Sequence, residues 1–148
     1  MTNVCVFCQI AAGNRPDGVV AYEDDVVCVF ASRDQRPRNH GHMLVITRDH
    51  HRNLYDLPPS LDAPLMARVR LVAGAVQRAF GATGTSIQQN NEPPGQDVFH
   101  LHFHVIPHHG DTGQGGVPSG PYQVVDLDIR VAQAEAVKAA LSTGQRDF

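Results

Sequence analysis

The sequence predicts an α+β fold: an antiparallel sheet of about five strands, one long helix and a C-terminal helix, forming one domain over residues 1–148. Short runs of β-branched or apolar residues bounded by Gly, Asp and Asn predict the strands. Apolar residues at steps of three and four in two other segments predict the helices. Because short loops join most neighbouring strands, antiparallel pairing is favoured, and the helices then cover the sheet.

Four of the expected strands are the runs at residues 19–22, 26–30, 43–47 and 84–89. The fifth, at residues 100–105, alternates three histidines with three apolar residues: His100, Leu101, His102, Phe103, His104 and Val105. Successive side chains of a strand point to opposite faces, so the imidazoles are expected in a row, roughly 6.6 Å apart. The apolar residues then face the core.

The long helix is expected over residues 61–80, where the apolar positions are Leu61, Leu65, Val69, Val72, Val76 and Phe80. Pro64 is tolerated in its first turn, and Gly81 ends it. The C-terminal helix is expected from about residue 129 to 142. The glycine- and proline-rich segment 110–121 is expected to be a mobile loop leaving the histidine strand.

Composition excludes several classes of function. No apolar run approaches the roughly 20 residues of a membrane helix, and the first ten residues do not resemble an export signal, so we expect a cytoplasmic protein without membrane contact. A net charge of -3 argues against a broad nucleic-acid surface. Three cysteines, an odd number, fit a reducing compartment better than a set of disulfides.

The histidine strand and the turn-rich loop before it predict phosphate chemistry. In the loop at residues 89–98, Asn91 and Gly95 can adopt left-handed backbone angles that expose N–H groups to an anion. A neutral imidazole beside that anion is a nucleophile toward phosphorus, and a second imidazole can stabilise the charge that develops on the phosphoryl oxygens. The sequence has no GxxxxGK[ST] motif and no acidic ligand cluster, so we expect covalent phosphoryl or nucleotidyl transfer without a catalytic metal.

These residues resemble the histidine triad (HIT) family of hydrolases, including its Hint and fragile histidine triad branches. The match consists of four segments in the family's order: CVFCQI at 5–10, HGHMLVI at 40–46, HHRNL at 50–54, and GQDVF followed by HLHFHVI at 95–106. Four ordered matches are more specific than the triad alone. The resemblance covers nearly the whole chain.

The resemblance implies three catalytic histidines. His102 is the expected nucleophile toward the α-phosphate, forming a nucleotidyl-histidine intermediate. His104 is expected to contact the phosphoryl oxygens, and His42 to support the site from the neighbouring strand.

The resemblance also implies a nucleotide-binding set. Asp34 precedes His42 by eight residues, the family spacing of the acid that binds the ribose hydroxyls. Gln89 occupies a phosphate-binding position, and the loop residues complete the set: Asn91, Gly95, Gln96 and Asp97. The implied substrate is a purine nucleotide, with adenosine favoured, and the implied assembly is a homodimer.

The pair Cys5-x-x-Cys8 has several interpretations. By itself it could be a redox pair, half of a metal site or a chance occurrence. The resemblance implies a structural zinc site completed by His50 and His100, with two thiolates and two imidazoles in a closed tetrahedral set. Cys28 is expected to be a core residue.

The favoured function is a nucleotide hydrolase or transferase acting on a phosphoramidate or a dinucleoside polyphosphate. Two alternatives remain open at this stage. One is a metal-dependent hydrolase or oxygenase that uses the three triad histidines as ligands. The other is a nucleotide-binding regulatory module with little turnover.

Overall fold

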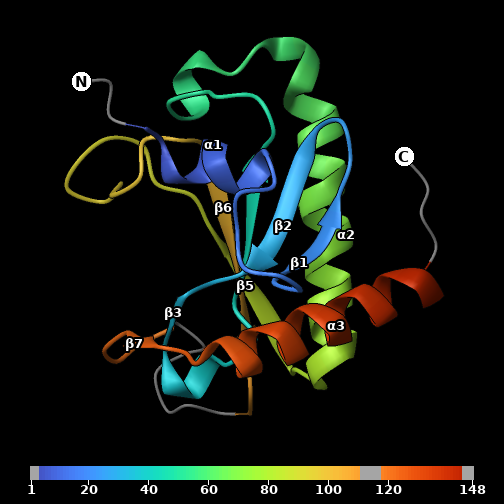
Figure 1. Ribbon diagram of the computed structural model, residues 1–148. Helices are drawn as coiled ribbons and strands as arrows, with labels where there is room; N and C mark the ends of the chain where they lie inside the picture. Colours follow the sequence, from blue (N-terminus) through green and yellow to red (C-terminus); the bar gives the residue numbers. More distant parts are fainter. Residues whose placement is uncertain (1–3, 111–117, 145–148) are drawn as a thin grey trace.

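The computed structural model describes residues 4–110 and 118–144. Its centre is a five-stranded antiparallel sheet in the order β1-β2-β4-β6-β5 (Figure 1). The strands are β1 (Val20–Glu23), β2 (Val27–Ala31), β4 (Met43–Thr47), β5 (Gly84–Gln88) and β6 (His102–His108). The predicted fold class is therefore confirmed, and β6, the histidine strand, lies between β4 and β5.

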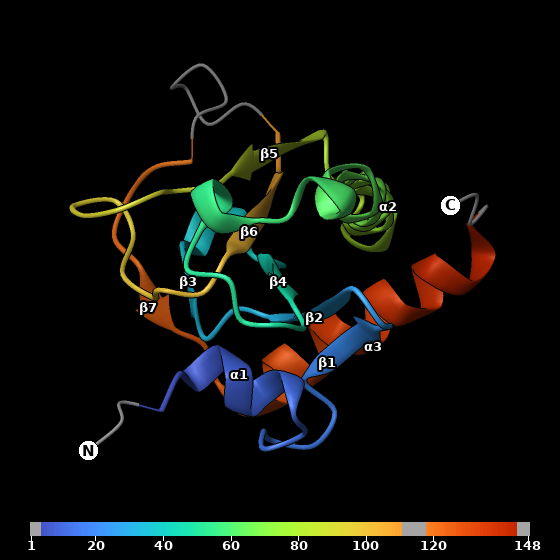
Figure 2. The ribbon, with the colours of Figure 1, turned by 90° about the horizontal axis from the view of Figure 1, so that it is seen from above.

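The helices cover opposite faces of this sheet (Figure 2). One face packs against α2 (Asp62–Phe80) and α3 (Leu127–Thr143), and the other against the short α1 (Val6–Ala11). Gly81 ends α2 with a left-handed backbone (φ 58°), as its position predicts. Among the described residues, no helix is both long and apolar enough to span a membrane.

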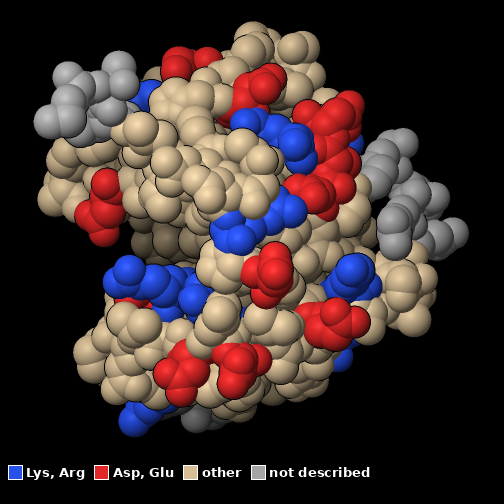
Figure 3. Space-filling view, in the orientation of Figure 1, with Lys and Arg blue, Asp and Glu red and all other residues tan. Residues whose placement is uncertain are grey.

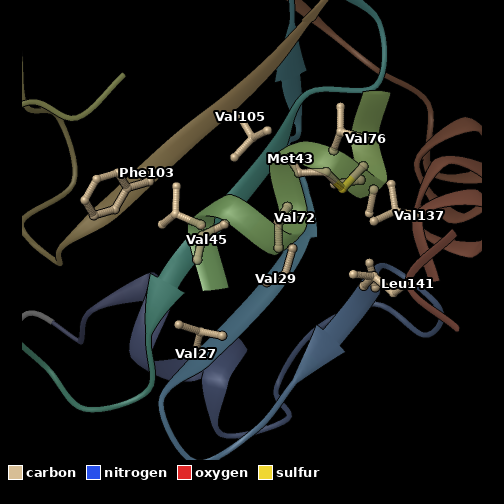
Figure 4. Close-up of a cluster of buried hydrophobic side chains, with 14 of the residues drawn as sticks. Val27, Val29, Met43, Val45, Val72, Val76, Phe103, Val105, Val137 and Leu141 are labelled. Carbon is tan, nitrogen blue, oxygen red and sulfur yellow. The ribbon is translucent and has the colours of Figure 1, made fainter. Parts of the chain in front are cut away.

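The larger apolar core fills the space between the sheet and the two long helices (Figure 4). It includes Val72 and Val76 of α2, Val137 and Leu141 of α3, and the strand residues Val27, Val29, Met43, Val45, Phe103 and Val105. Full burial of such a side chain stabilises the fold by about 1.5–3 kcal/mol. Because Leu101, Phe103 and Val105 are anchored here, the intervening His102 and His104 point to the opposite face, toward α1.

Several details differ from the sequence prediction, among them the end of β6, which extends to His108. The helix α3 begins at Leu127, two residues before the expected start, and His100 lies just before β6 rather than within it. The sequence pattern did not reveal α1 or the two-stranded sheet of β3 (Asp34–Gln35) and β7 (Gln123–Val124). These elements are too short to show a hydrophobic period. Of the expected loop 110–121, residues 111–117 lie outside the described residues.

Candidate active site

His102 lies at the centre of the site, on β6 beside β4. Its Nδ1 lies 2.7 Å from the carbonyl oxygen of His100, which can only accept a hydrogen bond. Nδ1 therefore carries the proton, and Nε2 keeps a free lone pair. The ring of Phe7 packs edge-on against His102 with a centroid distance of 5.1 Å. One hydrogen bond and one aromatic contact thus fix the orientation of this imidazole.

The environment keeps His102 uncharged at neutral pH. Burial lowers the pKa of His102 below its usual 6.5, and this effect outweighs the opposing effects of the hydrogen bond to His100 and the charge of Asp97. A neutral imidazole with an exposed lone pair is the form that attacks an electrophile. His102 therefore has the protonation state and the tautomer of a nucleophile.

His104 and His42 continue the row. The ring centroids of His102 and His104 are 5.0 Å apart, and Nδ1 of His104 lies 3.0 Å from Nε2 of His42. Burial lowers the pKa of His42 to about 3, with a further contribution from His104. Burial also lowers the pKa of His104 to about 4, with contributions from His102 and Arg36. The three predicted catalytic histidines are therefore in contact, and none is charged at pH 7.

A close backbone approach positions His42. Gly41, with a φ of 98°, lies against Phe80 at the end of α2, and a Cβ atom there would come within 2.6 Å of that ring. Only glycine fits this position without displacing Phe80. The long helix thus helps to place His42, which is 1% exposed, beneath His104.

The loop that precedes β6 is held by a polar network centred on Asn53, a buried residue. The Nδ2 group of Asn53 donates to Glu92 and to Gln96, at 2.9 and 3.2 Å. Arg52 makes a paired contact with Glu92 through two nitrogens, each at 2.8 Å. The amide of Gln96 donates to the carbonyl oxygens of Arg52 and Val98 and accepts from the backbone N–H of Glu92. Gln96 therefore acts within the structure as a scaffold of the loop.

The backbone of this loop differs from the prediction. Asn91 and Gly95 were expected to adopt left-handed angles, but neither has a positive φ. Glu92 adopts this conformation instead, with a φ of 66°. Its carboxylate is bound to Arg52 and Asn53, and these contacts offset the steric cost that a side chain pays at positive φ.

The other expected nucleotide-binding residues lie in the loop before β6 and on β3, and their contacts differ. Gln89 and Asn91 donate to each other's amide oxygens at 2.8 and 2.7 Å, so a phosphate would have to replace these bonds. Gly95 and Asp97 are exposed in the same loop, and the charge of Asp97 acts on His102. Asp34 is half-buried on β3 and lies 3.5 Å from the guanidinium of Arg33.

Four residues that could hold a metal ion form a separate cluster beside the triad. The ligand atoms of Cys5, Cys8, His50 and His100 all lie within 4.8 Å of one another. This is the one such cluster among the described residues, and it contains neither His102 nor His104. The geometry therefore gives no support to a metal bound by all three triad histidines.

The donor set of the cluster fits zinc. Nε2 of His100 lies 2.6 Å from the carbonyl oxygen of Thr47 and must donate to it, which turns the lone pair of Nδ1 toward the thiols. Sulfur-to-nitrogen distances are 3.4 Å for Cys5–His100, 3.5 Å for Cys8–His100 and 3.2 Å for Cys8–His50. A tetrahedral zinc ion, with bonds of about 2.0 Å to nitrogen and 2.3 Å to sulfur, separates its ligands by roughly 3.5 Å.

Protonation in this cluster depends on the ion. Burial, together with the neighbouring Cys5, raises the pKa of the Cys8 thiol to about 11, so without a cation the thiol is neutral at pH 7. Burial lowers the pKa of His100 to about 4, which leaves its imidazole neutral and able to ligate. Metal binding would therefore release thiol protons.

Some site residues were not identified from the sequence. Phe7 contacts His102, and Glu92 with Arg52 orders the loop. The position of Phe7 between Cys5 and Cys8 is a usable signal, because a shared metal would bring that helix to the histidine strand.

Comparison with known proteins supports the resemblance to the histidine triad family. Residues 13–111 match the family model of the HIT domain. The chain belongs to the HIT family. Membership supports nucleotide hydrolysis or transfer as the general class of function.

Individual HIT proteins are similar over much of this chain. The Bacillus subtilis protein named Hit is 38% identical over 107 residues, covering 72% of each chain. An Arabidopsis thaliana protein named adenylylsulfatase HINT3 is 38% identical over 109 residues, 72% of this chain and 53% of the relative. The chain thus spans about half the length of that relative.

Solved HIT structures share the fold over nearly the full chain. A Bartonella henselae HIT-like protein involved in cell-cycle regulation has a TM-score of 0.80 and 33% identity, covering 95% of this chain and 98% of that one. A Mycobacterium smegmatis HIT protein, described as zinc-bound, has a TM-score of 0.74 and 32% identity, covering 93% of each chain.

Proposed function

We propose that this protein is a nucleotide hydrolase or transferase that acts at the α-phosphate through a nucleotidyl-His102 intermediate. The observation that carries the proposal is the hydrogen bond from Nδ1 of His102 to the carbonyl oxygen of His100. It sets the tautomer of a buried, uncharged imidazole, so the lone pair of Nε2 is available for attack on phosphorus.

The proposed reaction has two displacements. In the first, Nε2 of His102 forms a bond to the α-phosphorus while the bond to the leaving group breaks, and the electron pair departs with that group. When Nε2 of His42 donates to Nδ1 of His104, the remaining N–H of His104 is free to donate to a phosphoryl oxygen. In the second, a water molecule attacks phosphorus and gives up one proton to solvent, the nitrogen–phosphorus bond breaks, and its electron pair returns to Nε2 of His102.

The substrate is proposed to be a purine nucleotide with a phosphoramidate or phosphoanhydride leaving group. The Arabidopsis relative named adenylylsulfatase supports inclusion of adenylyl sulfate in that class. Asp34 is proposed to bind the ribose, and Gln89, Asn91, Gly95 and Asp97 of the loop to contact the phosphate, while Gln96 holds that loop in shape. A homodimeric assembly is part of the same proposal.

We also propose that Cys5, Cys8, His50 and His100 bind a structural zinc ion. The donor geometry and the zinc-bound relative from Mycobacterium smegmatis support this assignment. Two thiolates and two imidazoles would complete the coordination of the ion, whose role would be to hold α1 against the histidine strand.

The decisive experiment is to trap the intermediate. The native protein is mixed with adenosine 5′-phosphoramidate or adenylyl sulfate and quenched, and intact-mass spectrometry with peptide mapping locates an adenylyl group on His102. His102→Ala should give no adduct and no turnover yet still bind nucleotide, while His109→Ala, altering a histidine just beyond β6, should behave like the native protein.

Other outcomes would support the alternatives. Turnover by His102→Ala at the native rate contradicts the nucleophile. Nucleotide binding without turnover or adduct in the native protein supports a regulatory module. Activity that disappears on chelation before any unfolding is detected supports a catalytic metal.

A further inference from the structure

The segment around Arg36 contains a guanidinium held in a fixed position. Arg36 directly follows β3, and its Cζ lies 4.1 Å from the centroid of the Tyr122 ring. Its Nη1 donates to the hydroxyl of Tyr122 at 2.8 Å, and its Nε donates to the carbonyl oxygen of Gly120 at 3.1 Å. Two hydrogen bonds and a cation–π contact therefore orient the side chain before any ligand binds.

No carboxylate neutralises this cation among the described residues. The neighbouring Arg33 lies 3.5 Å from Asp34, whereas Arg36 forms no ion pair within residues 4–110 and 118–144. Tyr122 and Gly120 are both uncharged partners. Among the described residues, several of the five N–H donors of the guanidinium, including those of Nη2, thus have no partner and can bind an anion.

This cation lies beside the catalytic histidines. The ring of Tyr122 is 6.4 Å from the ring of His42, which contacts His104 through a nitrogen-to-nitrogen distance of 3.0 Å. The positive charge of Arg36 contributes to lowering the pKa of both histidines. In Figure 3 the surface is recessed between the lobe that carries the 89–98 loop and β3, and basic side chains gather over β3 at the lower rim.

A cation beside His42 and His104 stabilises a leaving group that is anionic. His42 and His104 are neutral at pH 7 and supply hydrogen bonds without charge. In an in-line displacement the leaving group lies away from His102, and a departing sulfate or phosphate gains negative charge as its bond breaks. Guanidinium groups bind such tetrahedral anions through paired N–H donors. A neutral amine leaving group gains nothing from this contact.

We propose that Arg36, positioned by Tyr122, binds the anionic leaving group of the substrate and so selects phosphoanhydrides, including mixed anhydrides with sulfate, over phosphoramidates. This inference rests on the proposed function, because it assigns the part of the substrate beyond the α-phosphate. It makes Arg36 a specificity residue and Tyr122 its positioning residue.

The first test compares two substrates that share adenosine and the α-phosphate. For adenylyl sulfate, Arg36→Gln should lower kcat/KM by about 10- to 100-fold, the usual effect of losing a hydrogen bond to a charged group. For adenosine 5′-phosphoramidate, the change should stay within about twofold. Arg36→Lys should retain part of the preference, since it keeps the charge and loses the fork of donors.

Matched variants separate this role from general effects of charge and folding. Arg38→Gln removes an exposed arginine two residues away and should leave both substrates unaffected. Tyr122→Phe keeps the ring but removes the hydroxyl partner of Nη1, so it should weaken turnover of adenylyl sulfate by a smaller factor than Arg36→Gln. Because Tyr122→Phe retains the ring, it tests the role of Arg36 even where Arg36→Gln fails to fold.

The second test needs no turnover. In a His102→Ala background, Arg36→Gln should weaken binding of adenylyl sulfate by about 10-fold or more while binding of AMP stays within about twofold. Equal losses for the two ligands, or for the two substrates, would overturn the inference, since Arg36 would then act on the α-phosphate or through His42. The inference would also be overturned if Arg36→Gln left the ratio of the kcat/KM values for adenylyl sulfate and adenosine 5′-phosphoramidate unchanged.

The two proposals fail in distinguishable ways. A native protein that forms no His102 adduct contradicts the proposed function, while the binding comparison still decides whether Arg36 recognises the anion. A native protein that forms the adduct but shows no difference between Arg36→Gln and Arg38→Gln contradicts only the role of Arg36.

Discussion

At the scale of single residues, the environment of each histidine in the row determines its role. His100, His102 and His104 are spaced evenly in the sequence, yet each faces different partners: thiols, a backbone carbonyl and a second imidazole. His100 links two of these roles. Its side chain belongs to the cluster of Cys5, Cys8, His50 and His100, and its carbonyl oxygen sets the tautomer of His102. A disturbance of the metal cluster should therefore reach the nucleophile.

His42 offers a test of positioning at this scale. His42→Gln keeps an amide near Nδ1 of His104 but loses the rigid ring, so His104 should be held less firmly. We expect kcat to fall by up to about 100-fold, the loss associated with slight misplacement of a catalytic group, with little change in KM. Steady-state kinetics with His109→Gln as the control measures this split. A rise in KM at unchanged kcat would instead assign His42 to substrate binding.

At the scale of elements, α1 connects the metal cluster to the catalytic row. This six-residue helix is too short to be stable alone, and it packs on the sheet through Phe7 and Ala11. Cys5 and Cys8 tie it to His50 and His100, and Phe7 then rests on His102. The position of α1 on the histidine strand therefore depends in part on the contacts of Cys5 and Cys8 with His50 and His100.

Removal of one thiol should loosen the packing of α1 on the sheet. We expect Cys8→Ser to lose most bound zinc, measured by elemental analysis, and to lower the midpoint of thermal unfolding by several degrees, since 1 kcal/mol shifts that midpoint by about 2–4 °C in proteins near this size. Cys28→Ala, which alters a buried thiol on β2 outside the cluster, should retain the zinc. Full zinc content in Cys8→Ser would contradict the proposed ligand set.

The shape of the 89–98 loop depends on the hydrogen bonds that Asn53 donates to Glu92 and Gln96. Asn53→Ala leaves the buried oxygen of Gln96 with one donor fewer and removes a contact of Glu92, so the loop should lose its fixed shape. We expect the KM for nucleotide to rise by roughly 10-fold, as the phosphate site must be ordered on binding. Asn90→Ala, which removes an asparagine side chain within the 89–98 loop itself, is the matched control and should leave the KM unchanged. Nucleotide affinity at the native level in Asn53→Ala would show that the phosphate site does not depend on this network.

At the scale of the whole molecule, the two faces of the sheet differ: the larger apolar core lies on one face, and the histidines lie on the other beside a smaller apolar cluster. One face is covered by α2 and α3 over a continuous apolar core, and the other carries the histidines, the metal cluster and α1. Burial of neutral imidazoles on this second face couples the stability of the fold to pH. The anchored apolar residues of β6 keep the row in place despite that cost.

Acid should therefore destabilise the protein well above the pH at which its carboxylates titrate. The pKa values of His42 and His104 are about 3 and about 4 in the folded chain, against roughly 6.5 when unfolded. Between these values the unfolded chain binds more protons, so the free energy of unfolding is highest above pH 6.5 and falls as the pH drops toward 4.

Urea unfolding at pH 7.5 and at pH 5.0 measures this effect. The midpoint should be lower at pH 5.0, and His42→Gln should show a smaller difference because one depressed group no longer titrates. Equal midpoints at the two pH values in the native protein would contradict the burial of neutral histidines.

The motif spacing was sufficient to predict the strand that carries His102 and His104 and the face of that strand on which they lie. An alternating pattern anchors every second residue in the core. Because Phe103 and Val105 are buried there, His104 and His102 must lie on the opposite face of the strand. The same logic placed the long helix and its end at Gly81. The sequence also named the four members of the metal cluster, because the resemblance brought together segments far apart in the chain.

Only the tertiary structure decided the states of these residues. The tautomer of His102, the left-handed backbone at Glu92 and the orientation of Arg36 on Tyr122 depend on partners separated in sequence or on loop contacts without periodicity. A repeating pattern reports which face of an element is buried, and so the sequence determined the fold class and which residues of β6 face the candidate site. Protonation, backbone angle and side-chain direction are set by the groups that folding places within a few ångströms of each other, and no local pattern encodes them.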